Sequence, residues 1–155
     1  MAGKRSQGRQ QVSAGRNTLR IIGGRWRSRR LDFVASEGLR PTTDRVRETL
    51  FNWLAGAIRG ARCADLFSGS GALGLEALSR GAAHCDFVDT HRASVEAVRR
   101  HLRDLRAEDQ AACHHCSAGT FLARGSERFD IVFLDPPFGQ ELVAPAGSFC
   151  KTTTG

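Results

Sequence analysis

The sequence has no apolar run long enough to cross a membrane, which excludes a transmembrane helix. A spanning helix needs roughly 18 or more consecutive apolar residues, and no stretch of this chain approaches that length. The basic N-terminus also lacks the apolar segment of a secretory signal. We therefore expect a protein of the cytoplasm with no membrane contact.

Cysteine is sparse and irregularly spaced, which argues against a disulfide framework. An odd number of scattered cysteines is typical of a reducing compartment. The five cysteines are Cys63, Cys85, Cys113, Cys116 and Cys150. Residues 113–116, with the sequence Cys-His-His-Cys, resemble half of a zinc site, but no second ligand pair accompanies them. We therefore predict a structural strand or loop there and no bound metal.

The net charge of +7 is unevenly distributed along the chain. Residues 1–47 hold 12 Lys/Arg and 3 Asp/Glu, whereas residues 48–155 hold 11 Lys/Arg and 13 Asp/Glu. A basic segment beside a near-neutral body predicts contact with the phosphates of a nucleic acid. For residues 1–16 alone, a solubilising tail is the alternative.

The first 60 residues predict a tail, a hairpin and a helix. Residues 1–16 are polar and basic, so we expect a flexible tail. Gly23-Gly24 separates two apolar-bearing runs within residues 19–34, which predicts a small β-hairpin. A helix is expected after Pro41, capped by Thr42 or Thr43, with Asp44 in its first turn. Its predicted apolar stripe comprises Val46, Leu50, Trp53, Leu54 and Ile58.

From residue 61 onward the sequence predicts alternating strands and helices. The expected strands cover residues 63–67, 84–88, 111–116 and 129–134. The helix after the second strand has a stripe at helical spacing, formed by Val95, Val98, Leu102 and Leu105. The last strand is almost wholly apolar, as is typical of a central strand buried on both faces. This order predicts an α/β fold with a parallel, Rossmann-like sheet and right-handed crossovers.

A glycine-rich loop follows the first of these strands. Residues 69–74 match the pattern GxGxxG, in which glycines let the backbone approach a ligand closely. Asp89 ends the second strand 20 residues after Gly69, where a carboxylate can accept hydrogen bonds from both hydroxyls of a ribose. These features fit NAD as well as S-adenosylmethionine. A tight turn at the loop and a helix-capping role for Asp89 are the alternatives.

Asp135-Pro136-Pro137-Phe138 favours methyl transfer to an amino group on a nucleic-acid base. Such an amino group is a poor nucleophile because its lone pair is delocalised into the ring. The Asp135 carboxylate and the Pro136 carbonyl are suitable acceptors for its two N–H bonds, and the prolines hold that carbonyl rigidly. Phe138 can stack on the base and align it with the methyl donor. A proline-rich turn at the end of the strand is the alternative.

With these motifs in place, residues 20–138 resemble the bacterial 16S rRNA guanine-N2 methyltransferase family, RsmD. The resemblance is carried by residues 20–26, 39–48, 65–71 and 133–138. It implies a class I S-adenosylmethionine-dependent methyltransferase fold. It also implies that the substrate amino group is N2 of guanine 966 in small-subunit rRNA. The expected partner is 16S rRNA or a small-subunit assembly intermediate, and the protein is expected to be a monomer.

Motifs and resemblance together assign the site residues. The predicted catalytic residues are Asp135, Pro136, Pro137 and Phe138. The predicted cofactor-binding residues are Asp65, Phe67, Gly69, Ser70, Gly71, Asp89, Ser117, Ala118, Arg40 and Thr42. The predicted RNA-binding residues are Arg20, Arg25, Arg27, Arg29, Arg30 and Arg45.

The expected organisation divides the chain into four parts. These are a basic flexible tail at 1–16, a basic β-hairpin extension at 17–40, a methyltransferase domain at 41–138 and a divergent or truncated tail at 139–155. The family continues beyond Phe138 with further strands, so the chain is expected to be C-terminally truncated, which would leave the last strand with a bare edge. His91 and Ser117 also depart from the family pattern, in which acidic or amide side chains are common. A catalytically inactive RNA-binding fragment and an NAD-binding oxidoreductase are the alternative functions.

Overall fold

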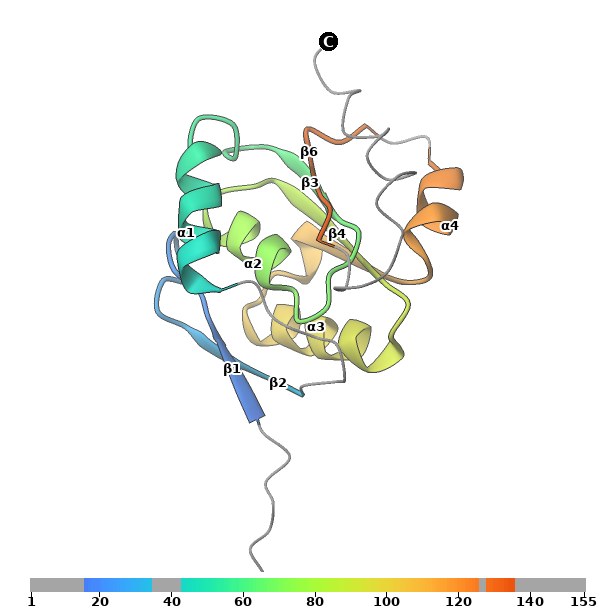
Figure 1. Cartoon of the computed structure of the whole chain (residues 1–155), viewed down its shortest axis with the longest axis horizontal. Coiled ribbons are helices and arrows are strands. Elements are labelled where there is room, and N and C mark those ends of the chain that lie inside the picture. The colour runs from blue at the N-terminus through green and yellow to red at the C-terminus, as the bar shows by residue number, and fades with distance from the viewer. Residues whose placement is uncertain (1–15, 35–42, 126–127, 136–155) are drawn as a thin grey trace, which may run out of the picture.

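A computed structural model of the chain describes residues 16–34, 43–125 and 128–135. In these residues a two-stranded hairpin lies beside a four-stranded sheet flanked by helices (Figure 1). Predictions for the N-terminal tail, for residues 35–42 and for residues 136–155 lie outside the described residues. Among the described residues, none of the helices is both long and apolar enough to cross a membrane.

The predicted hairpin is confirmed, but its turn is longer than two residues. Strands β1 (Arg16–Arg20) and β2 (Arg30–Val34) pair antiparallel. The nine residues between them form a loop rather than a tight Gly-Gly turn. Gly24 has φ +80°, and a Cβ there would lie 1.9 Å from the carbonyl oxygen of Ser79. Its glycine is therefore required by the close approach of the loop to a helix.

Helix α1 (Asp44–Trp53) begins as predicted, but its most buried residues are not those of the predicted stripe. Thr43 caps it, and its side chain accepts a hydrogen bond from the Val46 amide at 3.3 Å. The predicted apolar stripe is only partly confirmed: Leu50 and Leu54 pack against the core, whereas Val46 is 54% exposed and Trp53 is 80% exposed. The buried residues are Arg47 and Phe51. Ile58 is buried, but it lies beyond the end of the helix.

The central sheet has the predicted parallel topology. It consists of β3 (Arg62–Asp65), β4 (His84–Asp89), β5 (Ala111–His115) and β6 (Ile131–Phe133). Their spatial order is β5-β4-β3-β6, and every neighbouring pair is parallel. The chain order reverses between β3 and β6, which is the switch point where open α/β sheets bind ligands. The predicted burial of the last strand on both faces is not observed, because only Phe133 of β6 is buried and β6 lies at the edge of the described sheet.

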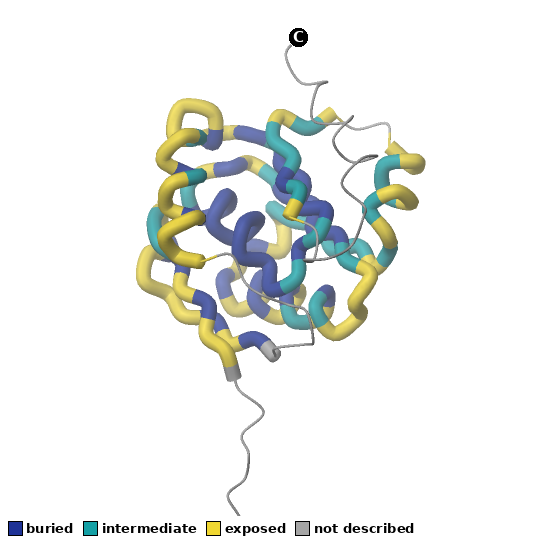
Figure 2. The backbone as a smooth tube through the Cα atoms, in the orientation of Figure 1, coloured by how far each residue is buried: buried dark blue, intermediate teal, exposed yellow. Residues whose placement is uncertain are grey.

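The helices that flank the sheet differ in how far they are buried. Every residue of α2 (Ala72–Ser79) is buried, and Figure 2 shows this helix as the centre of the core. Helix α3 (Arg92–Asp104) buries Val95, Val98 and Leu102 as predicted, and Leu105 is buried just after it. A short 3-10 turn (Glu108–Gln110) leads into β5, and α4 (Ala118–Ala123) follows that strand. Helix α2 thus begins directly after Gly71, at the end of the segment in which the cofactor loop was predicted.

Candidate cofactor and substrate site

Predicted site residues from four strands meet at one edge of the sheet. Asp65 and Asp89 are the last residues of β3 and β4, and Asp135 comes two residues after β6. Asp65 is in register with Phe133, and Asp89 with His115. Because all these strands are parallel, their carboxyl ends form a single binding edge. The structure therefore brings together acidic residues that are up to 70 positions apart in the sequence.

The glycine loop is fixed to this edge by its backbone. Gly69 and Gly71 have φ values of +50° and +82°, a region that glycine adopts at little steric cost. The Ser68 amide donates to the Val88 carbonyl at 3.0 Å, and the Gly69 amide donates to Asp89 Oδ2 at 2.9 Å. A Cβ at Gly71 would lie 2.9 Å from Val98 Cγ2. The loop is thus held tightly between β4 and α3, with its backbone facing the binding edge.

Asp89 retains hydrogen-bonding capacity for a ligand. Its Oδ2 accepts from Gly69, and its Oδ1 accepts from the His91 amide at 2.7 Å. A carboxylate offers about four acceptor positions, so about half of them remain available for the hydroxyls of a ribose. The contact with His91, the N-cap residue of α3, shows that Asp89 also helps to fix the start of that helix.

Asp65, the last residue of β3, carries a buried carboxylate oxygen, Oδ1, that has no hydrogen-bond partner among the described residues. Asp65 is only 1% exposed, and its Oδ2 accepts from the Gly74 amide at 3.1 Å. Burial is the main cause that raises the pKa of Asp65 to about 7; the Gly74 amide opposes the rise, and the nearby charges of Asp135 and Asp89 add to it. A cationic ligand would offset the cost of burying the ionised carboxylate. These residues therefore fit the ammonium and sulfonium groups of S-adenosylmethionine.

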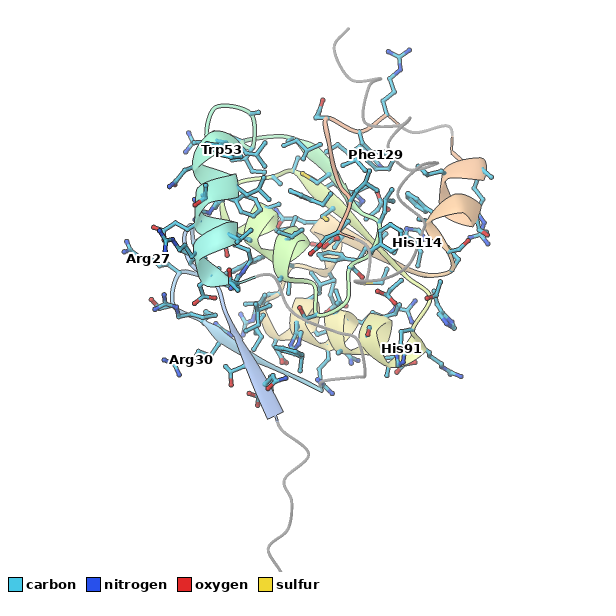
Figure 3. All side chains as sticks on the ribbon, viewed as in Figure 1. Arg27, Arg30, Trp53, His91, His114 and Phe129 are labelled. Carbon is cyan, nitrogen blue, oxygen red and sulfur yellow. The ribbon has the colours of Figure 1, made fainter. Side chains whose placement is uncertain are left out.

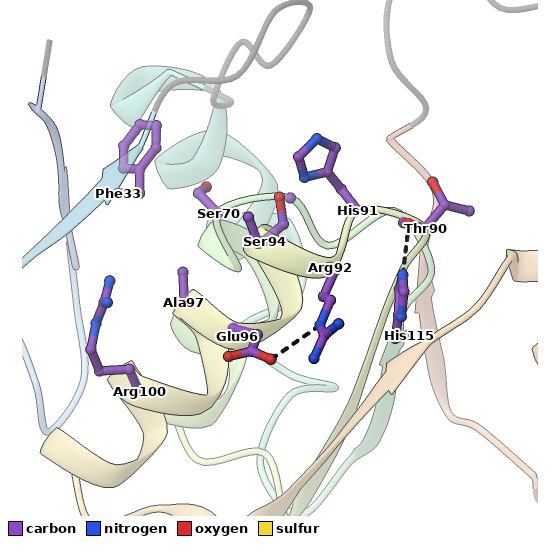
Figure 4. Close-up of a pocket in the computed structure, with 12 residues that line it drawn as sticks. Phe33, Ser70, Thr90, His91, Arg92, Ser94, Glu96, Ala97, Arg100 and His115 are labelled. Carbon is purple, nitrogen blue, oxygen red and sulfur yellow. Dashed lines mark hydrogen bonds and ion pairs between the residues drawn. The ribbon is translucent and has the colours of Figure 1, made fainter. Parts of the chain in front are cut away.

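A pocket of about 850 Å³ opens from the glycine loop along the first turns of α3 (Figure 4). This volume lies in the range of about 300–1,000 Å³ that is usual for ligand pockets. Gly69 and Ser70 line one end, and Phe33 of β2 lines the hairpin side. The remaining lining residues are Thr90, His91, Arg92, Ala93, Ser94, Glu96, Ala97, Arg100 and His115. The pocket therefore connects the predicted cofactor loop with the basic hairpin.

Other predicted cofactor residues are placed less directly. Ser117 caps α4, since its hydroxyl accepts from the Thr120 amide at 3.1 Å and donates to Thr120 Oγ1 at 2.8 Å. Phe67 and Ala118 pack against a small cluster around Leu66 on one face of the sheet. Among the described residues predicted to bind the cofactor, Gly69 and Ser70 line the pocket. The others do not: Asp65, Phe67, Gly71, Asp89, Ser117 and Ala118. Arg40, Thr42, Pro136, Pro137 and Phe138 lie outside the described residues.

The predicted RNA-binding arginines differ in their surroundings. Arg27, Arg29 and Arg30 are exposed and have no acidic partner among the described residues; Figure 3 shows Arg27 and Arg30 pointing outward from the hairpin. Two others are engaged with the body. Arg20 lies 3.7 Å from Asp44, and Arg25 donates to Gln110 while stacking over Trp26. Arg45 is exposed on α1.

Residues 113–115 of the Cys-His-His-Cys segment lie in β5 and Cys116 follows the strand, and the two thiols lie apart. Cys113 packs with the main core, whereas Cys116 packs with the cluster on the other face of the sheet. His114 Nε2 lies 2.9 Å from Asp86 Oδ1. Among the described residues, no group of three metal-ligating side chains converges.

Sequence reasoning missed a buried polar group that holds the hairpin to helix α2. Glu76 on α2 is 0% exposed, and it contacts both the hairpin loop and Arg47 of α1. The one available signal was a single acidic residue in the otherwise apolar or small helix 72–79. Its partners in the hairpin loop, Ile22 and Gly23, lie more than 50 residues away, in a segment with no regular periodicity.

A family model described as conserved hypothetical protein 95 matches residues 19–152. Ribosomal RNA small subunit methyltransferase D of Haemophilus influenzae is 43% identical over 139 residues, covering 88% of this chain and 72% of that protein. The chain belongs to this methyltransferase D family. The Escherichia coli K12 protein of the same name is 51% identical over 130 residues, covering 84% of this chain. The chain spans 65% of the length of that relative.

Solved structures support the same assignment. The structure of yhhF from Escherichia coli has a TM-score of 0.73 and 47% identity, covering 82% of this chain and 68% of that one. A hypothetical protein from Thermus has a TM-score of 0.73 and 31% identity, covering 85% and 77%. A more distant S-adenosylmethionine-dependent methyltransferase from Agrobacterium tumefaciens, at 20% identity and a TM-score of 0.61, shares the fold. The predicted class I methyltransferase fold with an N-terminal hairpin is thereby confirmed.

Proposed function

We propose that this chain takes part in S-adenosylmethionine-dependent methylation of a guanine N2 amino group in 16S rRNA, with guanine 966 as the family target. The observation that carries the proposal is the convergence of Asp65, Asp89 and Asp135 beside the glycine loop. The names of the relatives, which are rRNA small subunit methyltransferases, support rRNA as the substrate. The cofactor, when bound, supplies an electrophilic methyl group.

The residues of the chain would have separate tasks in this reaction. Asp65 and the glycine loop bind the charged end of the cofactor, and Asp89 accepts hydrogen bonds from its ribose. Asp135 accepts an N–H of the guanine amino group and stabilises the positive charge that develops on nitrogen. By the family resemblance, the Pro136 carbonyl accepts the second N–H and Phe138 stacks on the base. The guanine must first leave its stack, at a cost of a few kcal/mol.

The basic hairpin would hold the RNA outside the site. We assign residues 17–40 to RNA binding and residues 41–138 to the methyltransferase domain, acting as a monomer in the cytoplasm. The substrate would be 16S rRNA or a small-subunit assembly intermediate. The pocket between the hairpin and α3 connects the two functions, since it is lined by Phe33 on one side and by the glycine loop on the other.

The Asp135→Ala variant tests the catalytic assignment. We expect methylation of 16S rRNA to be lost, while the affinity for S-adenosylhomocysteine changes by less than about twofold, since Asp135 acts on the base rather than on the cofactor. Radiolabelled methyl transfer to naked 16S rRNA and to assembly intermediates measures the activity, and calorimetry measures cofactor binding. Asp109→Ala, which changes an exposed aspartate in the 3-10 turn, is the matched control.

The same assay separates the alternative functions. Wild-type turnover by Asp135→Ala would refute its catalytic role. A wild-type chain that binds 16S rRNA but neither binds the cofactor nor transfers methyl groups would instead be an RNA-binding fragment. Thermal stabilisation by NADH but not by S-adenosylhomocysteine would favour an oxidoreductase.

A further inference from the structure

One buried carboxylate on α2 fixes the loop of the basic hairpin. Glu76 Oε2 accepts from the Ile22 amide at 3.0 Å, and its Oε1 accepts from the Gly23 amide at 2.9 Å. Arg80 Nε donates to the same Oε1 at 2.8 Å. A buried charge is costly unless it is paired and hydrogen-bonded. Glu76 meets both conditions, and two of its partners are backbone groups of the hairpin loop.

Arg47 extends this network to α1. It is only 1% exposed, and its Nη1 lies 3.5 Å from Glu76 Oε2. The same Nη1 donates to the carbonyl of Arg20, the last residue of β1, at 2.9 Å. Arg47 Nη2 donates to Asp44, the first residue of α1. The network therefore fixes the end of β1 and the start of α1 together.

Ser79, three residues after Glu76, adds a second attachment. Its hydroxyl donates to the Gly23 carbonyl at 2.6 Å and accepts from the Trp26 amide at 3.1 Å. The Arg25 amide donates to the Ser79 carbonyl at 2.9 Å. Residues 22–26 of the hairpin are thus bonded to the last turn of α2. The first turn of the same helix begins at Gly71, in the cofactor loop.

We propose that Glu76 is a positioning residue that sets the basic hairpin in register with the glycine loop, and so orients bound rRNA toward the transferred methyl group. The inference rests on the proposed function. Glu76 is fully buried, so it contacts neither RNA nor cofactor and acts through the hairpin. Helix α2 is only about 12 Å long at 1.5 Å per residue. This short, buried helix therefore connects the basic hairpin directly to the cofactor loop.

The Glu76→Gln variant separates positioning from general stability. The amide keeps the shape of the side chain but removes the charge shared by Arg47 and Arg80, so the hairpin loop is held less firmly. If about a tenth of the molecules keep the binding-competent orientation, the Kd for 16S rRNA rises about tenfold. The Kd for S-adenosylhomocysteine is expected to change by less than about twofold, because the cofactor loop is held separately by Asp89 and β4. Glu108→Gln, an exposed change in the 3-10 turn, is the control.

A double-mutant cycle shows whether Glu76 acts through the hairpin. In a background in which Arg27, Arg29 and Arg30 are changed to Gln, Glu76→Gln should cause no further loss of RNA affinity. Full additivity of the two changes would overturn the proposal. So would equal losses of RNA and cofactor affinity, which would mark a merely structural role.

Ser79→Ala provides a milder variant in case Glu76→Gln does not fold. We expect faster hydrogen exchange at the Trp26 amide and a weaker form of the same RNA-selective loss. Faster exchange with unchanged RNA affinity would overturn the proposal. The proposed methylation is tested separately, since an RNA-selective loss in a chain with no methyl transfer would support positioning by Glu76 and refute the enzymatic assignment.

Discussion

At the scale of single residues, Asp65 makes stability depend on pH. Its pKa is raised from 3.8 to about 7 by burial, so the folded protein binds a proton that the unfolded chain releases. The stabilisation from this proton is complete below pH 3.8 and is lost as the pH rises through about 7. At about 1.36 kcal/mol per pKa unit, the loss is at most about 4 kcal/mol.

The Asp65→Asn variant should remove this dependence. We expect its free energy of unfolding, measured in urea from pH 4 to pH 8, to fall less with rising pH than that of the wild type. The exposed control Asp109→Asn should keep the wild-type slope. Parallel curves for the wild type and Asp65→Asn would show that Asp65 is ionised throughout the range.

Cofactor affinity gives a second prediction for the same residue. A cationic ligand favours the ionised carboxylate, so S-adenosylmethionine should bind more tightly at pH 8 than at pH 6 in the wild type. The Asp65→Asn variant should bind it weakly at both pH values, because it has no charge to ionise. Calorimetric titrations at pH 6, 7 and 8 make the comparison. A pH-independent wild-type affinity would contradict direct pairing between the ligand and Asp65.

At the scale of an element, the packing of α2 on β4 depends on Gly74. A Cβ at this position would lie 2.3 Å from the ring of Phe87 and 2.9 Å from Cys85 Sγ. Overpacking of a core costs about 1–3 kcal/mol, whereas Gly to Ala in a helix gains about 1 kcal/mol. We therefore expect Gly74→Ala to lower the free energy of unfolding in urea. Gly119→Ala in α4 has nothing within 4 Å of the new Cβ and should instead stabilise the protein slightly. Equal effects of the two changes would contradict this packing.

Helices α1 and α3 show what a hydrophobic pattern can and cannot predict. The stripe of α3 was predicted correctly because its apolar residues face the sheet and its charged residues face solvent. In α1, Arg47 would be expected to be exposed because it is charged. It is buried because it pairs with Glu76 and donates to the Arg20 carbonyl. Trp53 seemed suited to the core, yet it is exposed. Local periodicity cannot reveal partners that lie far away in the chain.

At the scale of the whole molecule, the order of strands and helices along the sequence was enough to predict the sheet and the edge at which the site lies. Alternating strands and helices predicted a parallel sheet, and parallel strands place their carboxyl ends together. The convergence of Asp65, Asp89 and the segment after β6 followed from that rule before any contact was known. The attachment of the hairpin to α2 could not be predicted in this way. It depends on hydrogen bonds between the side chains of Glu76 and Ser79 and backbone groups of the hairpin, and backbone groups are the same whatever the sequence.

The charge distribution leads to a prediction about RNA binding. Arg27, Arg29 and Arg30 are exposed on the hairpin. Arg124 is the C-cap residue of α4, and Arg128 is exposed between α4 and β6. Figure 1 shows α4 on the opposite side of the molecule from the hairpin. Each phosphate contact contributes about 0.7–0.9 to the slope of log K against log salt. Changing the three hairpin arginines to Gln should therefore weaken RNA binding and reduce the slope by about 2–3.

Filter binding of 16S rRNA between low and physiological salt measures that slope. Arg124→Gln with Arg128→Gln should leave it nearly unchanged, because α4 and the hairpin face different sides and bound RNA need not contact both. Arg25→Gln should have a distinct effect, since Arg25 is held by Gln110 and Trp26. Loss of the Arg25 side chain would mainly loosen the hairpin loop, and would have less effect on contacts with RNA phosphates. An unchanged slope in the triple hairpin variant would assign those arginines to solubility, and the RNA would then have to bind at another surface.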